Sequence, residues 1–151
     1  MTNGKWISLL AVAAFAGCMT TVQLAPSESD AAAKRFVPPD GKANLYVARS
    51  NASEGERALF RVSVDGKAVG PIAAGTFYLV ALDPGTHSVA ATSNENTSKA
   101  SFDAQAGKNY FFEVTATAGT ATPRVSLGLV LLEQMGKIMV QQDKRALNAS
   151  E

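Results

Sequence analysis

Cysteine and histidine each occur only once among the 151 residues of this chain. The single cysteine, Cys18, excludes a disulfide within the chain, and the single histidine, His87, excludes a metal site built from several imidazoles. An excess of charge of one sign is also missing, because 14 Lys and Arg face 13 Asp and Glu. A nearly neutral chain gives no electrostatic reason to bind nucleic acid or an anionic membrane face. The composition therefore excludes a disulfide scaffold, a zinc module and a basic nucleic-acid binder, and we predict no cofactor and no bound metal.

The apolar run near the amino terminus is short and is typical of a secretory signal. Lys5 precedes an apolar segment at 6–16, and small residues lie just before Cys18. As a helix this segment is about 17 Å long, against a hydrocarbon core of about 30 Å. An uncleaved membrane anchor has to include the polar residues that follow, so it is the less favoured alternative to a cleaved signal.

The tetrapeptide Phe15, Ala16, Gly17 and Cys18 resembles the lipobox of bacterial lipoproteins. In that family the cysteine thiol receives a diacylglyceryl group, and a signal peptidase that recognises the three preceding residues cuts the chain before it. Ala16 and Gly17 match the pattern, whereas Phe15 stands where leucine is usual. The resemblance implies a lipoprotein signal peptide at 1–17 and lipidation of Cys18. The alternative is that Cys18 is an incidental small apolar residue of a secretory signal.

We expect the mature protein to be lipid-anchored in the bacterial cell envelope. Met19 follows the cysteine, and the absence of aspartate there favours the outer membrane, with the protein facing the periplasm. Residues 18–42 predict a flexible tether, because prolines at 26, 38 and 39 interrupt them and their apolar residues follow no period. A flexible segment of about 24 residues has a root-mean-square reach of about 27 Å, which holds a domain near the membrane without pressing it onto the lipid.

From residue 43 onward, apolar and polar residues alternate, and turn residues recur about every ten positions. Residues 43–132 therefore predict a β domain, and residues 133–151 a C-terminal helix and tail, with the helix at 133–147. Short strands without helices between them favour a sandwich. We predict an all-β fold, an antiparallel β-sandwich of seven to eight strands with a C-terminal helix. The expected strands are 45–49, 59–64, 67–72, 76–82, 87–92, 100–102, 110–115 and 125–132.

Four segments carry expectations of their own. The dipeptide at 65–66, Asp-Gly, predicts a two-residue hairpin turn with positive φ. The return segment 67–72 contains a proline and is expected at a sheet edge. The most apolar segment, 125–132, is expected to be covered on both faces. The aromatic run 110–112 is interpreted as core on one face and partly covered on the other, with an exposed platform for a sugar or a partner as the alternative.

Three turn motifs carry a family resemblance. They are the Asp-Gly turn at 65–66, the sequence Asp83-Pro84-Gly85-Thr86-His87, and Gly107-Lys108 followed by an aromatic strand. Together they resemble the DUF2846 family of small bacterial lipoproteins of unknown function, over about residues 43–140. The first two motifs also resemble PEGA modules, which are small surface-associated β domains. The resemblance implies a β-sandwich held in the envelope and supplies no catalytic residues.

His87 is the one candidate for general-base catalysis, but no local motif supplies a nucleophile and an orienting carboxylate. We therefore expect a structural role, with the ring packed on the sheet and bonded to a loop carbonyl. Glu54 and Glu56 share a polar loop that could bind Ca²⁺ weakly, although a solvated loop is the preferred interpretation. We predict no catalytic residue and no enzyme activity.

The sequence thus predicts a lipid-anchored envelope protein whose β-sandwich is a non-catalytic binding or structural module. The expected partners are the membrane, through the lipid anchor, and another envelope protein, contacted through sheet edges or loops. Two alternatives stay open. A carrier of a small ligand or glycan needs an apolar cavity between the sheets or an exposed aromatic row, and an envelope hydrolase using His87 needs a cleft with a serine and a carboxylate beside that residue.

Overall fold

The computed structural model of the protein describes residues 22–51, 55–142 and 145–149. Within these ranges it contains nine strands and two helices. In chain order they are α1 (Ser27–Ala33), β1 (Ala43–Arg49), β2 (Phe60–Val64), β3 (Lys67–Ile72), β4 (Thr76–Leu82), β5 (Gly85–Thr92), β6 (Thr97–Ala104), β7 (Asn109–Thr117), β8 (Arg124–Leu129), α2 (Glu133–Gln141) and β9 (Arg145–Ala146).

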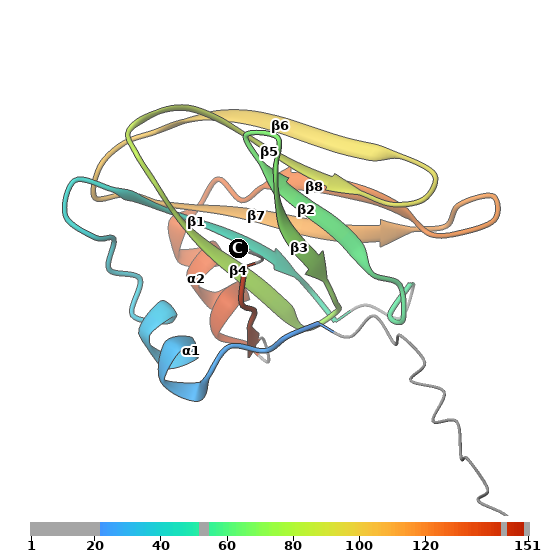
Figure 1. The fold of residues 1–151 in the computed structure, drawn as a ribbon, viewed down its shortest axis with the longest axis horizontal. Coiled ribbons are helices and arrows are strands. Elements are labelled where there is room, and N and C mark those ends of the chain that lie inside the picture. The colour runs from blue at the N-terminus through green and yellow to red at the C-terminus, as the bar shows by residue number, and fades with distance from the viewer. Residues whose placement is uncertain (1–21, 52–54, 143–144, 150–151) are drawn as a thin grey trace, which may run out of the picture.

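The strands form two sheets that lie face to face (Figure 1). One sheet has five strands in the order β8-β7-β1-β4-β9, and the other has four in the order β3-β2-β5-β6. The chain crosses from one sheet to the other after β1, β3, β4 and β6, so each sheet collects strands that are distant in sequence. The β-sandwich with a C-terminal helix is therefore confirmed, with nine strands in the described residues instead of the expected seven to eight.

Two strand pairs differ from the expected antiparallel arrangement. β1 pairs with β7 in parallel, and β4 pairs with β9 in parallel, whereas the other pairs of the described chain are antiparallel. Parallel neighbours need a long connection, and β1 and β7 are joined through the whole four-stranded sheet. Turn residues in the sequence indicate only pairing between strands that follow one another, so they do not predict the parallel pairing of β1 with β7.

The turn between β2 and β3 is the two-residue hairpin that the sequence predicts. Asp65 has a φ of 51° and Gly66 a φ of 77°, and Val64 lies opposite Lys67 across the turn. Positive φ at both central residues matches the right-handed twist of the flanking strands. β3 lies at the edge of its sheet, as its proline indicates.

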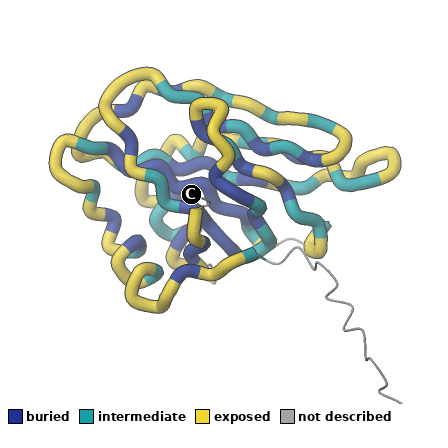
Figure 2. Tube along the Cα trace, viewed as in Figure 1, coloured by how far each residue is buried: buried dark blue, intermediate teal, exposed yellow. Residues whose placement is uncertain are grey.

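β1 is buried along its whole length, on both faces. Leu45 and Val47 face the space between the two sheets, where they belong to the main core. Tyr46 and Ala48 face the opposite side of the five-stranded sheet and belong to a second core beneath the helices. Figure 2 shows this as a dark blue centre under a mostly yellow surface. The fold must therefore cover both faces of this sheet.

The second core is built around the ring of Tyr46. The ring stacks on Phe111 with centroids 4.9 Å apart, and Phe36 packs on it at 5.3 Å. The Tyr46 hydroxyl donates a hydrogen bond to the carbonyl oxygen of Ala33 at 2.7 Å. α2 covers the same cluster, and Gly136 allows its close approach, because a Cβ there would lie 2.3 Å from the Phe111 ring. Burial of these rings explains why the helices adhere to the sheet.

Residues 22–42, which the sequence predicts as part of a flexible tether, are packed on the domain instead. Ala25, Ala33 and Phe36 are buried in the second core. The Asp30 carboxylate accepts a hydrogen bond from the amide of Ala146 at 2.7 Å. The tether prediction is wrong for this segment, because a few apolar side chains at irregular spacing are enough to fill a helix-sheet interface but leave no periodic pattern.

The C-terminal part also differs in detail from the sequence prediction. β8 is an edge strand that ends at Leu129, and among its residues only Val125 is buried, so the segment 125–132 is not covered on both faces. α2 ends at Gln141 rather than near 147, and Arg145–Ala146 adds a short strand to β4.

Candidate functional site

Four exposed apolar residues lie close together in the sequence where β8 passes into α2. Leu129 is 44% exposed, Leu131 85%, Leu132 67% and Met135 55%. We call these four residues the β8–α2 patch. Scattered exposed leucines are ordinary on a protein surface, whereas several large apolar side chains exposed along one short segment are typical of an interaction site.

The local fold explains why these side chains point outward. The amide of Val130 donates to the Phe111 carbonyl at 2.9 Å, which is the last backbone bond that ties this segment to β7. Leu132 is the extended N-cap residue of α2 and makes no side-chain capping bond. Leu131 and Leu132 therefore lie in the connection between an edge strand and a helix, where neither element covers them.

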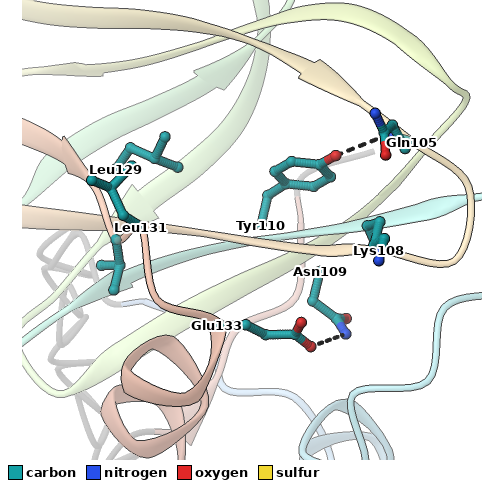
Figure 3. A pocket seen from close by; sticks show the side chains of 8 residues that line it. Gln105, Lys108, Asn109, Tyr110, Leu129, Leu131 and Glu133 are labelled. Atoms are coloured by element: carbon teal, nitrogen blue, oxygen red, sulfur yellow. Dashed lines mark hydrogen bonds between the residues drawn. The ribbon is translucent and has the colours of Figure 1, made fainter.

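A cavity of about 310 Å³ lies beside the patch and has a polar rim (Figure 3). Leu129 and Leu131 line one side, and Tyr110 lines the middle. The Tyr110 hydroxyl accepts a hydrogen bond from the amide of Gln105 at 3.0 Å. Below Tyr110 in this view, Glu133 accepts a hydrogen bond from the side-chain amide of Asn109 at 3.2 Å.

Glu133 is held in its charged form at this rim. Its carboxylate pairs with the Lys137 ammonium at 2.8 Å, one helical turn along α2. The bond with Lys137 and then the bond with Asn109 lower the pKa of the Glu133 carboxyl. The candidate site therefore joins an apolar surface to a fixed negative charge and its cation, which is the usual anatomy of a protein interface.

A second cluster ties two turns together around His87. Its Nδ1 lies 2.6 Å from the Asp65 carboxylate in the β2–β3 turn, and its Nε2 lies 2.8 Å from the Asp83 carbonyl oxygen in the β4–β5 turn. Asp65 also accepts from the Ser88 amide at 2.8 Å, and the Lys42 ammonium donates to the Asp83 carboxylate at 2.6 Å. The expected bond between His87 and a loop carbonyl is therefore present.

The electrostatics of this cluster follow from its hydrogen bonds. A carboxylate and a carbonyl both only accept, so the ring can donate at both nitrogens only as an imidazolium. The bond to Asp65 raises the pKa of His87 above its usual value, with a smaller contribution from the Asp83 carbonyl and a partial offset from burial. The same bond lowers the pKa of the Asp65 carboxyl.

Arg49 is a buried residue that the sequence analysis missed. It is 2% exposed and lies at the end of β1, on the inward-facing alternation of Leu45 and Val47. Its guanidinium donates to the carbonyl oxygens of Gly55, at 2.5 Å, and Ala58, and it lies over the Phe60 ring with the centroid 4.4 Å away. Burial lowers the pKa of Arg49. In the sequence, only its place in the alternation with Leu45 and Val47 indicates that Arg49 is buried, and an arginine at a strand end is ordinarily exposed.

The aromatic run 110–112 does not form an exposed platform. Phe111 is buried in the second core and Phe112 in the main core, while Tyr110 is half-buried at the cavity of Figure 3. The core interpretation is therefore confirmed for the face of Phe112, the face of Phe111 is buried rather than partly covered, and the platform alternative is wrong.

Other residues from the sequence analysis lie elsewhere. The lipobox residues Phe15, Ala16, Gly17 and Cys18 lie outside the described residues, as does Glu54, while Glu56 is exposed. In the ranges that the structure describes, no three His, Cys, Asp or Glu residues are grouped as metal ligands would be. Over the same ranges, no helix combines the length and the apolar character needed to cross a bilayer.

The two sheets and their turn motifs define a small β-sandwich module. Residues 39–128 match a family model described as a protein of unknown function, DUF2846. Because this match covers more than half of the chain, the protein belongs to the DUF2846 family. No curated protein sequence matches it. The match includes both turns that His87 joins, whereas α1, α2 and β9 lie outside it.

The pH dependence of stability should report the His87 cluster. Because the folded-state pKa of His87 is raised, its contribution is fully present below the unfolded pKa of about 6.5 and is lost as pH rises through the folded pKa. The lowered pKa of Asp65 has the opposite effect, present above about pH 4 and lost as pH falls through its folded pKa. We therefore expect the denaturant midpoint of the wild type to exceed that of His87→Gln most clearly between about pH 4 and about pH 6.5.

The measurement is chemical denaturation of both proteins from about pH 5 to about pH 9. His87 is the single histidine of the chain, so the difference between the two curves isolates its titration from that of the amino terminus. Midpoints that change in parallel across this range would show that the pKa of His87 is the same in the folded and the unfolded protein, and would contradict the raised pKa.

Proposed function

We propose that this protein is a lipid-anchored component of the bacterial envelope, on the periplasmic side of the outer membrane. Its β-sandwich acts as a non-catalytic module that binds another envelope protein through the β8–α2 patch. The observation that carries the binding role is the exposure of four large apolar side chains beside a charged rim. The anchor is inferred from the lipobox-like residues that end at Cys18.

The position of His87 supports a role without catalysis. In a hydrolase the Nε2 atom of the histidine takes the proton of a nucleophile, while Nδ1 is oriented by a carboxylate. Asp65 occupies the orienting position at Nδ1, but the Asp83 carbonyl oxygen occupies Nε2. A nucleophile would have to displace that carbonyl, and a carbonyl cannot itself be activated as a nucleophile.

The filling of the main core favours protein binding over carriage of a small ligand. The space between the sheets is occupied by aromatic and branched side chains, among them Phe60, Phe102, Phe112 and Tyr78. The cavity beside Tyr110 lies at the rim of this core, lined by the β6–β7 turn, the start of β7 and the segment from Leu129 to Glu133. A surface of leucine and methionine with a polar rim is what a protein partner covers.

Acylation is the first test of this proposal. Cells fed labelled palmitate should incorporate the label into the wild-type protein, and Cys18→Ser should abolish it, because the thiol is the acylated group. The same variant should accumulate unprocessed or appear in the soluble fraction. An unlabelled wild-type band, detected by antibody at normal abundance, would refute the lipid anchor.

Binding through the β8–α2 patch is tested by crosslinking in living cells. A photoreactive amino acid at Leu131 should give a discrete crosslinked species, whereas the same probe at the exposed Ser101 of β6 should not. Adding Met135→Asp should suppress the Leu131 product. Both positions are exposed, so these changes should alter the unfolding free energy by no more than about 0.5 kcal/mol. Identical products from Leu131 and Ser101 would contradict the proposed surface.

A further inference from the structure

Val22 is the first residue that the structure describes, and the residues after it pair with the C-terminal segment. The amide of Asn148 donates to the Gln23 carbonyl at 3.0 Å, and the amide of Ala25 donates to the Ala146 carbonyl at 2.9 Å. Leu24 forms an antiparallel bridge with Leu147 between these two bonds. The Val22 side chain packs against the main core. The N-terminal segment is thus paired, through an isolated bridge, with the residues at and just after β9.

Only three residues, 19–21, separate Cys18 from Val22 in the sequence. Four Cα-to-Cα steps separate Cys18 from Val22, and even a fully extended chain spans no more than about 14 Å over that length. The limit holds for any conformation of the intervening residues. It is about half of the root-mean-square reach of about 27 Å that a free tether of 24 residues would have.

We propose that the β9 edge of the five-stranded sheet faces the lipid bilayer and that the domain is held against the membrane surface in one orientation. This inference rests on the proposed lipid anchor at Cys18. The anchored side contains Gln23, Leu24 and Asn148, which are all exposed. Leu24 is 45% exposed, so it is an apolar side chain available to the interfacial region of the leaflet.

The opposite edge of the same sheet is then directed away from the lipid. β9 and β8 are separated by three strands, which places them about 19 Å apart across the sheet. Figure 1 shows β6 and β8 on one side of the molecule and α1 with the start of the described chain on the other. The β8–α2 patch begins at the end of β8, so this orientation presents it to the periplasm rather than burying it in lipid.

Depth-dependent quenching tests the orientation on the full, acylated chain. Acylation blocks the thiol of Cys18, the single native cysteine. Asn148→Cys and Ser126→Cys therefore each introduce one free thiol for a fluorophore. Asn148 lies at the β9 edge and Ser126 on β8, and both are exposed. The proteins are reconstituted into vesicles of phosphatidylethanolamine and phosphatidylglycerol that contain a nitroxide-labelled lipid. We expect the probe at 148 to be quenched several-fold more strongly than the probe at 126.

A spacer variant is the matched control. Insertion of twenty Gly-Ser residues between Thr21 and Val22 leaves the anchor and the fold unchanged but removes the length limit. We expect the difference between the two probes to disappear in this variant. Gln23→Cys, a second exposed position on the anchored side, should reproduce the strong quenching at 148 if that label perturbs the fold.

The outcomes separate this inference from the anchor itself. Equal quenching at 148 and 126 in a protein that sediments with the vesicles would overturn the orientation and leave the lipid anchor intact. A protein that carries no acyl label and does not sediment with vesicles would overturn both. A difference that persists with the spacer would show that something other than the short connection orients the domain, and would also overturn the inference.

Discussion

Burial of both faces of β1 is the constraint on which the rest of the fold depends. A strand covered on one face needs only a second sheet, and the four-stranded sheet supplies that cover to Leu45 and Val47. Tyr46 on the other face needs a different cover, because its buried ring needs apolar packing partners and its hydroxyl needs a hydrogen-bond acceptor. Phe111 supplies the stacking partner, and the Ala33 carbonyl accepts the hydroxyl. The segments that precede and follow the sandwich are therefore structural parts of it.

This constraint connects the two ends of the chain to one another and to the anchor. α1 and Phe36 cover Tyr46, and the strand at Arg145–Ala146 is fixed between β4 and residues 23–25. The same packing that shields the ring brings the domain close to Cys18. Residues 22–42, which the sequence predicts as part of a flexible tether, therefore limit the distance between the domain and the lipid.

Local signals in the sequence predicted the parts of the fold that local chemistry determines. The turn at Asp65–Gly66 was predictable because only a few residue pairs adopt positive φ at both positions. The bond between His87 and a loop carbonyl followed from its place just after a turn. Even the β-sandwich followed from strand length and spacing alone.

The remaining features depend on contacts between distant segments, which a single sequence does not encode as a pattern. The second core joins Phe36 to Tyr46 and Phe111, and nothing periodic marks Phe36 as buried. The segment 125–132 is the most apolar of the chain, yet its end is exposed as the β8–α2 patch. High apolar content indicated burial there, whereas the structure places the residues at a sheet edge. Arg49 was missed because its charge argued for exposure.

The most direct test of this structure measures how much residues 22–42 contribute to the stability of the folded domain. Chemical denaturation should compare a soluble chain that starts at Val22 with one that starts at Ala43, followed by tyrosine fluorescence and circular dichroism. We expect the shorter chain to unfold at a much lower denaturant concentration, or to be unfolded without denaturant, because it exposes Tyr46 and Phe111. Equal midpoints and equal slopes for the two chains would contradict the second core, and with it the short connection between the domain and the membrane.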